Sequence, residues 1–231
     1  MRRQRYFFSR SSVDDCEKKD VYSLLSDALT RRIFMADDPE VTRLEILNRR
    51  IMDDLDLRIS KTTIKPSPIA GRGLFATVDC KPGEILTCYP GDGIIRTPDP
   101  ENEKSWSIQW GDHVIAPEDR SRTMKDLSIT MRGYILYMDD GHSIIGLPRY
   151  DDDTSYLGHF ANDGAKYPTC STEIEAYVEE SNATCNARHQ GISGDCHMVT
   201  MSTRHIKAGD EIFVTYGAEY WIQQTSYNVD G

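Results

Sequence analysis

The sequence has few cysteines and no long apolar run, the features that zinc sites and membrane spans need. It contains only six cysteines among 231 residues, none in a Cys-x-x-Cys pair. Three of them lie near His189 and His197, but the spacings match no standard zinc site, so we predict no metal. No apolar run approaches the roughly 20 residues that a transmembrane helix needs. The cysteines are Cys16, Cys80, Cys88, Cys170, Cys185 and Cys196.

The chain is also short of positive charge. It has 27 Lys and Arg against 37 Asp and Glu, a net charge of -10. Nucleic-acid binding needs a basic surface, so we expect no direct contact with nucleic acid. An acidic protein attracts basic peptides, although acidic surfaces more often serve solubility. The basic residues 1–5 precede only three aromatic residues, too few for a signal peptide, and we expect an intracellular protein with free thiols and no membrane partner.

Two helical patterns lie before residue 58. Asp20 can cap the first helix, and Asp38-Pro39 starts the second, with proline at the first helical position. We predict that residues 1–57 form a helical extension that supports the packing of the main domain. Apolar residues recur at helical spacing at Val21, Leu24, Leu25, Ala28, Leu29 and Ile33, and again at Val41, Leu44, Leu47, Ile51 and Leu55.

From Arg58 the pattern changes to short apolar runs separated by Gly, Pro and Asp. Such a pattern indicates a mostly β domain. Asp139-Asp140-Gly141-His142 is a plausible hairpin turn, and we interpret residues 165–184 as a surface loop or insertion. The predicted strands fall at residues 59–64, 84–89, 106–110, 114–116, 134–138 and 143–145.

Three short segments carry the chemistry. In Gly71-Arg72-Gly73, two glycines allow a backbone to approach a ligand, but no third glycine or helix follows, which excludes a dinucleotide fingerprint. Alone, the motif is more often a turn. Asn162 offers amide donors and an acceptor, or forms a turn with Asp163. Tyr216, in the third segment, Gly209–Gly217, would alone be an ordinary core or surface aromatic.

Together and in this order, the three segments resemble the SET-domain protein lysine methyltransferases over about residues 60–222. The resemblance implies a mostly β SET fold at residues 58–222, with short curled sheets around a C-terminal pseudoknot, and a tail at 223–231. It also implies S-adenosylmethionine as cofactor. The cysteine-rich zinc segments that flank the domain in many members are not found, as in compact viral and microbial members.

The resemblance also assigns the cofactor-binding residues. In the family, the backbone of the glycine motif wraps the methionine part of the cofactor. Asp163 stands where the family has histidine, and Trp221 could stack on adenine or close the lysine channel. The residues expected to bind the cofactor are Arg72, Gly73, Leu74, His159, Asn162, Asp163, Tyr216 and Trp221.

By the same resemblance, Tyr216 and Tyr89 are the catalytic tyrosines of a lysine channel. Asn186-Ala187-Arg188-His189 resembles the family segment that lines this channel. Val214 stands where many members carry Tyr or Phe, a position that helps to set the number of methyl groups added. The residues expected to bind the substrate are Tyr89, His189, Val214 and Tyr216.

The activity implied is S-adenosylmethionine-dependent lysine methylation of a basic protein. A histone tail is the substrate expected from the family, which would place the protein in the nucleus. The acidic run at residues 151–153 could face such a peptide or be a solvated loop. Two alternatives stay open: a catalytically silent SET module that binds a peptide or partner, which Asp163 and Val214 favour, and a methyltransferase for a non-histone protein.

Overall fold

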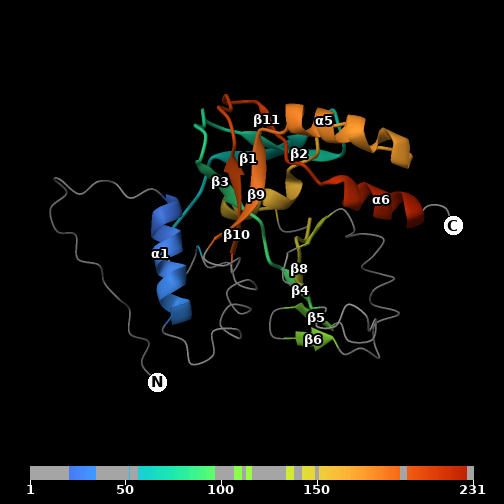
Figure 1. Cartoon of the computed structure of the whole chain (residues 1–231). Coiled ribbons are helices and arrows are strands. Elements are labelled where there is room, and N and C mark those ends of the chain that lie inside the picture. The colour runs from blue at the N-terminus through green and yellow to red at the C-terminus, as the bar shows by residue number, and fades with distance from the viewer. Residues whose placement is uncertain are drawn as a thin grey trace, which may run out of the picture.

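The computed structural model describes residues 21–34, 52, 57–96, 107–110, 113–115, 134–137, 142–148, 151–192 and 197–227. In these segments, short antiparallel strands form three small sheets, with a few helices at their sides (Figure 1). The prediction of a mostly β domain is confirmed.

The first two sheets contain three strands each. The first has the order β1 (Thr62–Pro66), β2 (Arg72–Ala76) and β11 (Glu211–Ile212). The second has the order β3 (Ile85–Cys88), β10 (His197–Ser202) and β9 (Ala187–Ile192). All six residues of the central strand β10 are buried, as expected for a strand with a neighbour on each side.

The third sheet has five strands in the order β6-β5-β4-β8-β7. Ile94 and Ile144 pair across its middle and are buried. Strands β7 and β8 pair antiparallel, with Tyr137 opposite Ser143, while the predicted turn at residues 139–141 lies outside the described residues. The strands are β4 (Gly93–Arg96), β5 (Ser107–Trp110), β6 (His113–Ile115), β7 (Ile135–Tyr137) and β8 (His142–Ile145).

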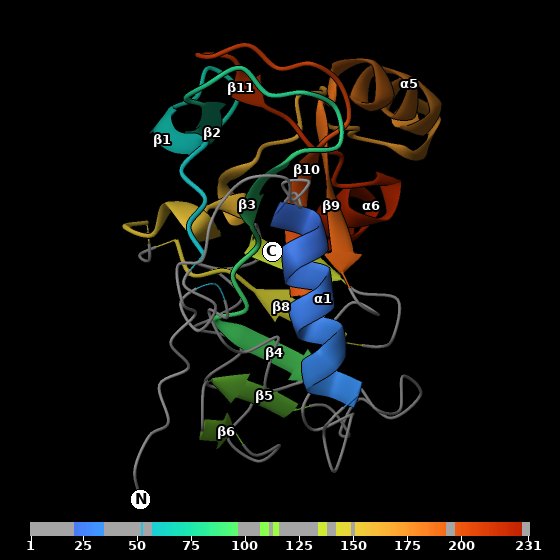
Figure 2. The ribbon, with the colours of Figure 1, turned by 90° about the vertical axis from the view of Figure 1, so that its left-hand side faces the viewer.

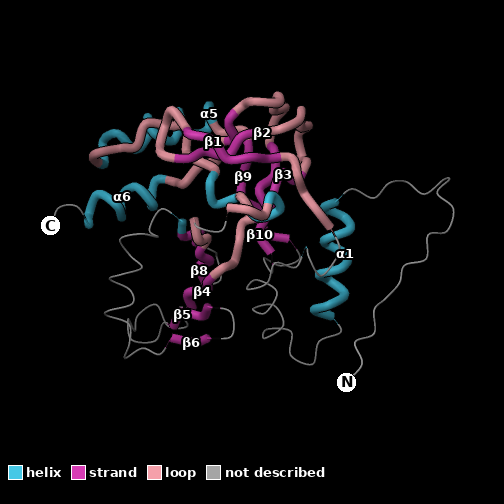
Figure 3. The backbone as a smooth tube through the Cα atoms, turned by 180° about the vertical axis from the view of Figure 1, so that it is seen from behind, coloured by secondary structure: helices cyan, strands magenta, loops and turns pink. Residues whose placement is uncertain are grey.

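The helices lie on either side of the sheets. Figure 3 shows the strands in the middle, α1 (Val21–Phe34) on one side, and α5 (Ile174–Thr184) and α6 (Ala218–Tyr227) on the other. Three short 3-10 helices, η3 (Thr154–Tyr156), η4 (Gly158–Phe160) and η5 (Ser171–Glu173), connect the elements. Among the residues that the structure describes, no helix is long and apolar enough to cross a membrane.

The first predicted helix is confirmed as α1. Leu25 and Leu29, one helical turn apart, are fully buried in a core cluster that also holds Ile85 and Val199 of the second sheet. Figure 2 shows the helix standing beside β9 and β10. The second predicted helix lies outside the described residues except for Met52, which belongs to the same core cluster.

One predicted strand boundary and one predicted loop are corrected. The first strand begins at Thr62, because the N–H of Ile59 donates to the Ser155 hydroxyl, 3.0 Å away, and its side chain enters the core. The loop predicted at residues 165–184 contains the helix α5. Only Tyr177 and Ser181 of α5 are buried, so its apolar pattern was too weak to reveal a helix.

The segment after β11 is held between two distant parts of the chain. On one side, the N–H of Val214 donates to the carbonyl of Asn162. On the other side, the Asn186 amide oxygen accepts from Phe213 N–H, and its Nδ2 donates to the carbonyl of Glu211. Backbone and amide groups thus hold the 211–217 segment from both sides, and this brings Tyr216 next to the Asn162 segment.

Candidate active site

The turn at residues 70–73 is held by Asn162. Its Nδ2 lies 3.2 Å from the carbonyl oxygen of Ala70 and 3.3 Å from that of Arg72. The same atom lies 3.1 Å from Oε1 of Glu211, so one amide group ties the glycine motif to β11. Asn162 therefore fixes the shape of the turn rather than merely forming a turn with Asp163.

The two glycines of the motif have different tasks. Gly71 has φ near +50°, which favours glycine, and its α-carbon faces open space. Gly73 has no such space, because a Cβ there would clash with the carboxylate of Glu211. Gly71 thus leaves room beside the turn, and Gly73 permits the turn to pack on β11.

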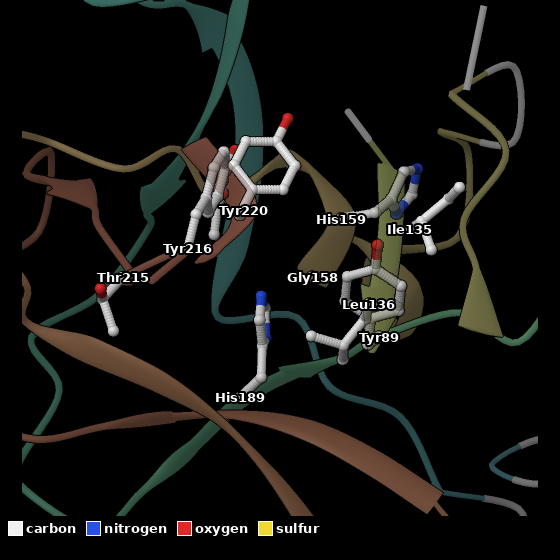
Figure 4. Close-up of a pocket in the computed structure, with 10 residues that line it drawn as sticks. Tyr89, Ile135, Leu136, Gly158, His159, His189, Thr215, Tyr216 and Tyr220 are labelled. Carbon is white, nitrogen blue, oxygen red and sulfur yellow. Dashed lines mark hydrogen bonds between the residues drawn. The ribbon is translucent and has the colours of Figure 1, made fainter. Parts of the chain in front are cut away.

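A cavity of about 120 Å³ lies between the second and third sheets, η4, the 211–217 segment and α6 (Figure 4). Figure 4 shows Tyr216 and Tyr220 on one side, His159, Ile135 and Tyr89 on the other, and His189 between them. Residues from distant parts of the chain meet here. The lining consists of Tyr89, Ile135, Leu136, Gly158, His159, Ala161, His189, Thr215, Tyr216 and Tyr220.

The two predicted catalytic tyrosines both line this cavity and keep their protons. The Tyr216 hydroxyl donates to the carbonyl of Ala161 at 3.2 Å, and the Tyr89 hydroxyl donates to that of Tyr134 at 2.7 Å. Burial raises the pKa of both hydroxyls well above the usual value. Each therefore presents a neutral oxygen with lone pairs free to accept a hydrogen bond.

His189 completes the polar lining in a neutral form. Burial lowers the pKa of its imidazole to about 4. Its Nδ1 lies 3.2 Å from the hydroxyl oxygen of Thr200, and its ring packs edge-on against Tyr89 at 5.1 Å. None of the described residues that line the cavity is an Asp, Glu, Lys or Arg.

Aromatic rings hold Tyr216 in place. Trp221 stacks on its ring at a centroid distance of 5.8 Å, and Tyr220 meets it edge-on at 5.0 Å. Tyr167 stacks on Trp221 in turn, at 5.5 Å. Trp221 thus packs against Tyr216, while its neighbour Tyr220 lines the cavity.

Asp163, the position that departs from the family pattern, is buried with 4% of its surface exposed. Its carboxylate accepts hydrogen bonds from the N–H of Ala165 and Tyr216 and from the hydroxyls of Tyr177 and Ser181. The side chain therefore joins α5 to the Tyr216 segment.

The other predicted residues lie at different depths. Leu74 and Val214 are buried in a core cluster with Ile212, so their side chains pack in the core and do not line the cavity. The Arg72 guanidinium lies over the ring of Phe160 at 4.5 Å and pairs with Asp151 at 2.6 Å. In the acidic run, Asp151 thus pairs with Arg72, and Asp153 caps η3.

Several lining residues were not predicted. Thr215 flanks Tyr216 in sequence, and that neighbour was its only signal. Ile135 and Leu136 looked like ordinary strand residues, and nothing local connects them with Tyr216. Among the cysteines that the structure describes, Cys80, Cys88, Cys170 and Cys185 are free thiols, and no described group of His, Cys, Asp and Glu could hold a metal ion.

Comparison with known proteins supports the resemblance. A comparison with curated proteins gave no match. The model of the SET domain matches residues 71–217, well over half of the chain, from the glycine motif to the glycine after Tyr216. The matched region holds the Asn162 brace, the 211–217 segment and nearly the whole cavity lining. The chain therefore belongs to the SET-domain protein lysine methyltransferase family.

Proposed function

We propose that this protein is an S-adenosylmethionine-dependent protein lysine N-methyltransferase that acts on basic tails of the histone type. One observation carries the proposal: Tyr216, Tyr89 and His189 line one uncharged cavity, next to the turn that Asn162 holds. Such a cavity suits an amine that must lose its proton before it reacts.

The chain's residues favour the neutral form of a lysine in this cavity. Lysine has an ordinary pKa near 10.4, so freeing its lone pair at neutral pH costs about 4–5 kcal/mol. Removing the ammonium from water lowers that pKa, and the described lining offers no carboxylate to restore the charge. Ile135 and Leu136 provide apolar contacts for the lysine stem.

The tyrosines orient the amine. Because the hydroxyl of Tyr216 donates to Ala161, its oxygen can accept an N–H of the incoming amine. Tyr89 is fixed in the same way by the carbonyl of Tyr134. Two anchored acceptors can hold the nitrogen lone pair in one direction, which is the positioning that an in-line displacement needs.

The residues around the 70–73 turn fit the cofactor. The open space at Gly71 allows close approach to the backbone, and Ala161 connects the Asn162 brace directly to the cavity. Arg72, Asn162 and the backbone of Gly73 would hold the cofactor. When bound, S-adenosylmethionine would supply an electrophilic methyl group and a positive charge.

The net charge and the family support a histone-like substrate. The net charge of -10 favours a Lys- and Arg-rich partner over an acidic one. Action on histones would require a nuclear location. A silent SET module is the alternative, but Asp163 is satisfied by four donors and leaves Tyr216 in place, so this departure gives it no support.

The test is a calorimetric titration of the purified protein with S-adenosylmethionine, followed by incubation with methyl-labelled cofactor and mixed histones. We expect binding and transfer of label to histone lysines. Binding without transfer would point to a non-histone substrate or a missing partner, which a peptide array would find. A protein that does not bind the cofactor would instead be the silent module.

A further inference from the structure

The helix α5 is attached to the domain through hydroxyl groups. Its two buried residues are Tyr177 and Ser181, one helical turn apart. Both hydroxyls donate to Asp163: that of Tyr177 to Oδ2 at 2.5 Å and that of Ser181 to Oδ1 at 3.1 Å. The inner face of this helix is thus directed at one buried carboxylate.

The same carboxylate holds the backbone of Tyr216. The N–H of Tyr216 donates to Oδ2 of Asp163 at 2.9 Å, and the N–H of Ala165 donates to Oδ1 at 3.1 Å. A carboxylate has about four lone pairs, and these four donors use them all. Asp163 therefore has little capacity left to contact a ligand.

Tyr177 also reaches the residue after Tyr216. Its oxygen accepts from the N–H of Gly217 at 3.1 Å while its proton goes to Asp163. Burial, followed by the Asp163 hydrogen bond, raises the pKa of Tyr177, so the hydroxyl stays protonated and can donate. Two successive backbone amides, those of Tyr216 and Gly217, thus donate to the Asp163–Tyr177 pair, and the Gly217 N–H also lies 3.2 Å from the hydroxyl oxygen of Thr215.

We propose that Tyr177 and Ser181, acting through Asp163, are positioning residues for the catalytic hydroxyl of Tyr216. The inserted helix α5 is then part of the active site, although the described lining of the cavity includes none of its residues. This inference rests on the proposed methyltransferase function. A shift of the Tyr216 hydroxyl by a fraction of an ångström would disturb the alignment of the amine, and such misplacement can cost up to about a hundredfold in rate.

The decisive variant is Tyr177→Phe, which keeps the ring and removes the shared hydroxyl. We expect kcat to fall about ten- to a hundredfold, with KM for peptide and cofactor changed less than about twofold. Ser181→Ala removes one donor that does not touch the Tyr216 segment, so its fall in kcat should be smaller. The matched control is Tyr156→Phe. It removes a buried hydroxyl that accepts from the N–H of Met52, in the core cluster that packs against α1. It should leave kcat unchanged.

A double-mutant cycle separates positioning from general loosening. In a Tyr216→Phe background, measured by residual label transfer, Tyr177→Phe should change kcat by less than about twofold, because its effect passes through Tyr216. If the losses of kcat caused by Tyr177→Phe and Tyr216→Phe instead multiply in the double variant, the proposal is overturned. So would a Tyr177→Phe variant that retains the wild-type kcat.

Hydrogen exchange gives a test that needs no activity. In Tyr177→Phe the Tyr216 amide keeps Asp163 as its acceptor, but the carboxylate loses the hydroxyl that holds it in place. We therefore expect the Tyr216 amide to exchange at least about tenfold faster in Tyr177→Phe than in the wild type. Faster exchange in Tyr177→Phe, together with a wild-type protein that transfers no methyl group, would overturn the enzyme proposal and keep the positioning network. Unchanged exchange would overturn the network itself.

Discussion

At the scale of single residues, the hydroxyl of Tyr216 is the group on which the chemistry depends. Tyr216→Phe removes the oxygen that orients the amine and leaves the ring to stack on Trp221. We expect kcat to fall about 10²–10³-fold while the Kd for S-adenosylmethionine stays within about twofold. Steady-state kinetics and calorimetry check both. Tyr167→Phe, at a ring that is 57% exposed, serves as the control, and an unchanged kcat in Tyr216→Phe would remove Tyr216 from the mechanism.

Asn162 makes a separate prediction about the cofactor. Asn162→Ala leaves the carbonyls of Ala70 and Arg72 without their donor, so the turn loses its fixed shape. We expect the Kd for S-adenosylmethionine to rise about tenfold or more, measured by calorimetry. Asn182→Ala, on the exposed side of α5, should leave it unchanged. An unaltered Kd in Asn162→Ala would mean that this segment does not belong to the cofactor site.

The family carries histidine at the position of Asp163, but this protein needs the aspartate. Replacing it by the histidine that the family carries should damage this protein, because an imidazole cannot accept from four donors. We expect Asp163→His to lower the free energy of unfolding by about 3 kcal/mol or more in chemical denaturation. The exposed Asp152→His should change it by less than about 0.5 kcal/mol. A stable, more active Asp163→His variant would contradict the network.

At this scale, the sequence revealed the site residues that lie in segments resembling the family. Tyr216 and His159 were named from two of the three motifs, and Tyr89 and His189 from two further segments that resemble the family. The structure brings all four to one cavity. The network around Asp163 could not be found in this way. Its partners lie 14, 18 and 53 residues further along the chain, and no local pattern joins them.

At the scale of elements, β10 gives the fold a built-in sensitivity to acid. Its His197 is 2% exposed, and burial lowers its pKa to about 4. The unfolded chain has an ordinary histidine pKa near 6.5, so as pH falls from about 6.5 the unfolded state takes up a proton that the folded state refuses. Stability is therefore fully present above about pH 6.5 and is lost progressively towards pH 4.

The loss attributable to His197 reaches about 3 kcal/mol. Denaturation measured from pH 7 to pH 4 should show a shallower decline in His197→Leu, because leucine does not titrate. His205→Leu, at an exposed histidine, should behave like the wild type. Parallel pH curves for the wild type and His197→Leu would mean that His197 does not control this decline.

The two helices α1 and α5 differ in how well they could be predicted from the sequence. Helix α1 was predictable because Leu25 and Leu29 repeat at helical spacing and are buried by contact with the second sheet. Helix α5 was missed because hydrogen bonds from Tyr177 and Ser181, rather than an apolar stripe, fix it to the domain. Hydrophobic periodicity detects burial by packing and has no sensitivity to burial by polar networks.

At the scale of the whole molecule, the second and third sheets, the 211–217 segment and α6 meet at one cavity whose described lining has no Asp, Glu, Lys or Arg. This convergence follows from contacts between distant segments, such as the brace from Asn162 to the carbonyl of Arg72, and from the clamp of Asn186 on Phe213. The family resemblance predicted that arrangement. Composition and periodicity alone would have reached only a mostly β domain with a helix before it.

The most direct test of the central claim is to locate the transferred methyl group. The full chain is incubated with S-adenosylmethionine and mixed histones, and mass spectrometry then maps the products. We predict methylation on lysine Nζ with the wild type, and its loss with Tyr216→Phe at equal cofactor binding. Methyl groups on another residue type, or equal lysine methylation by the two proteins, would contradict the account.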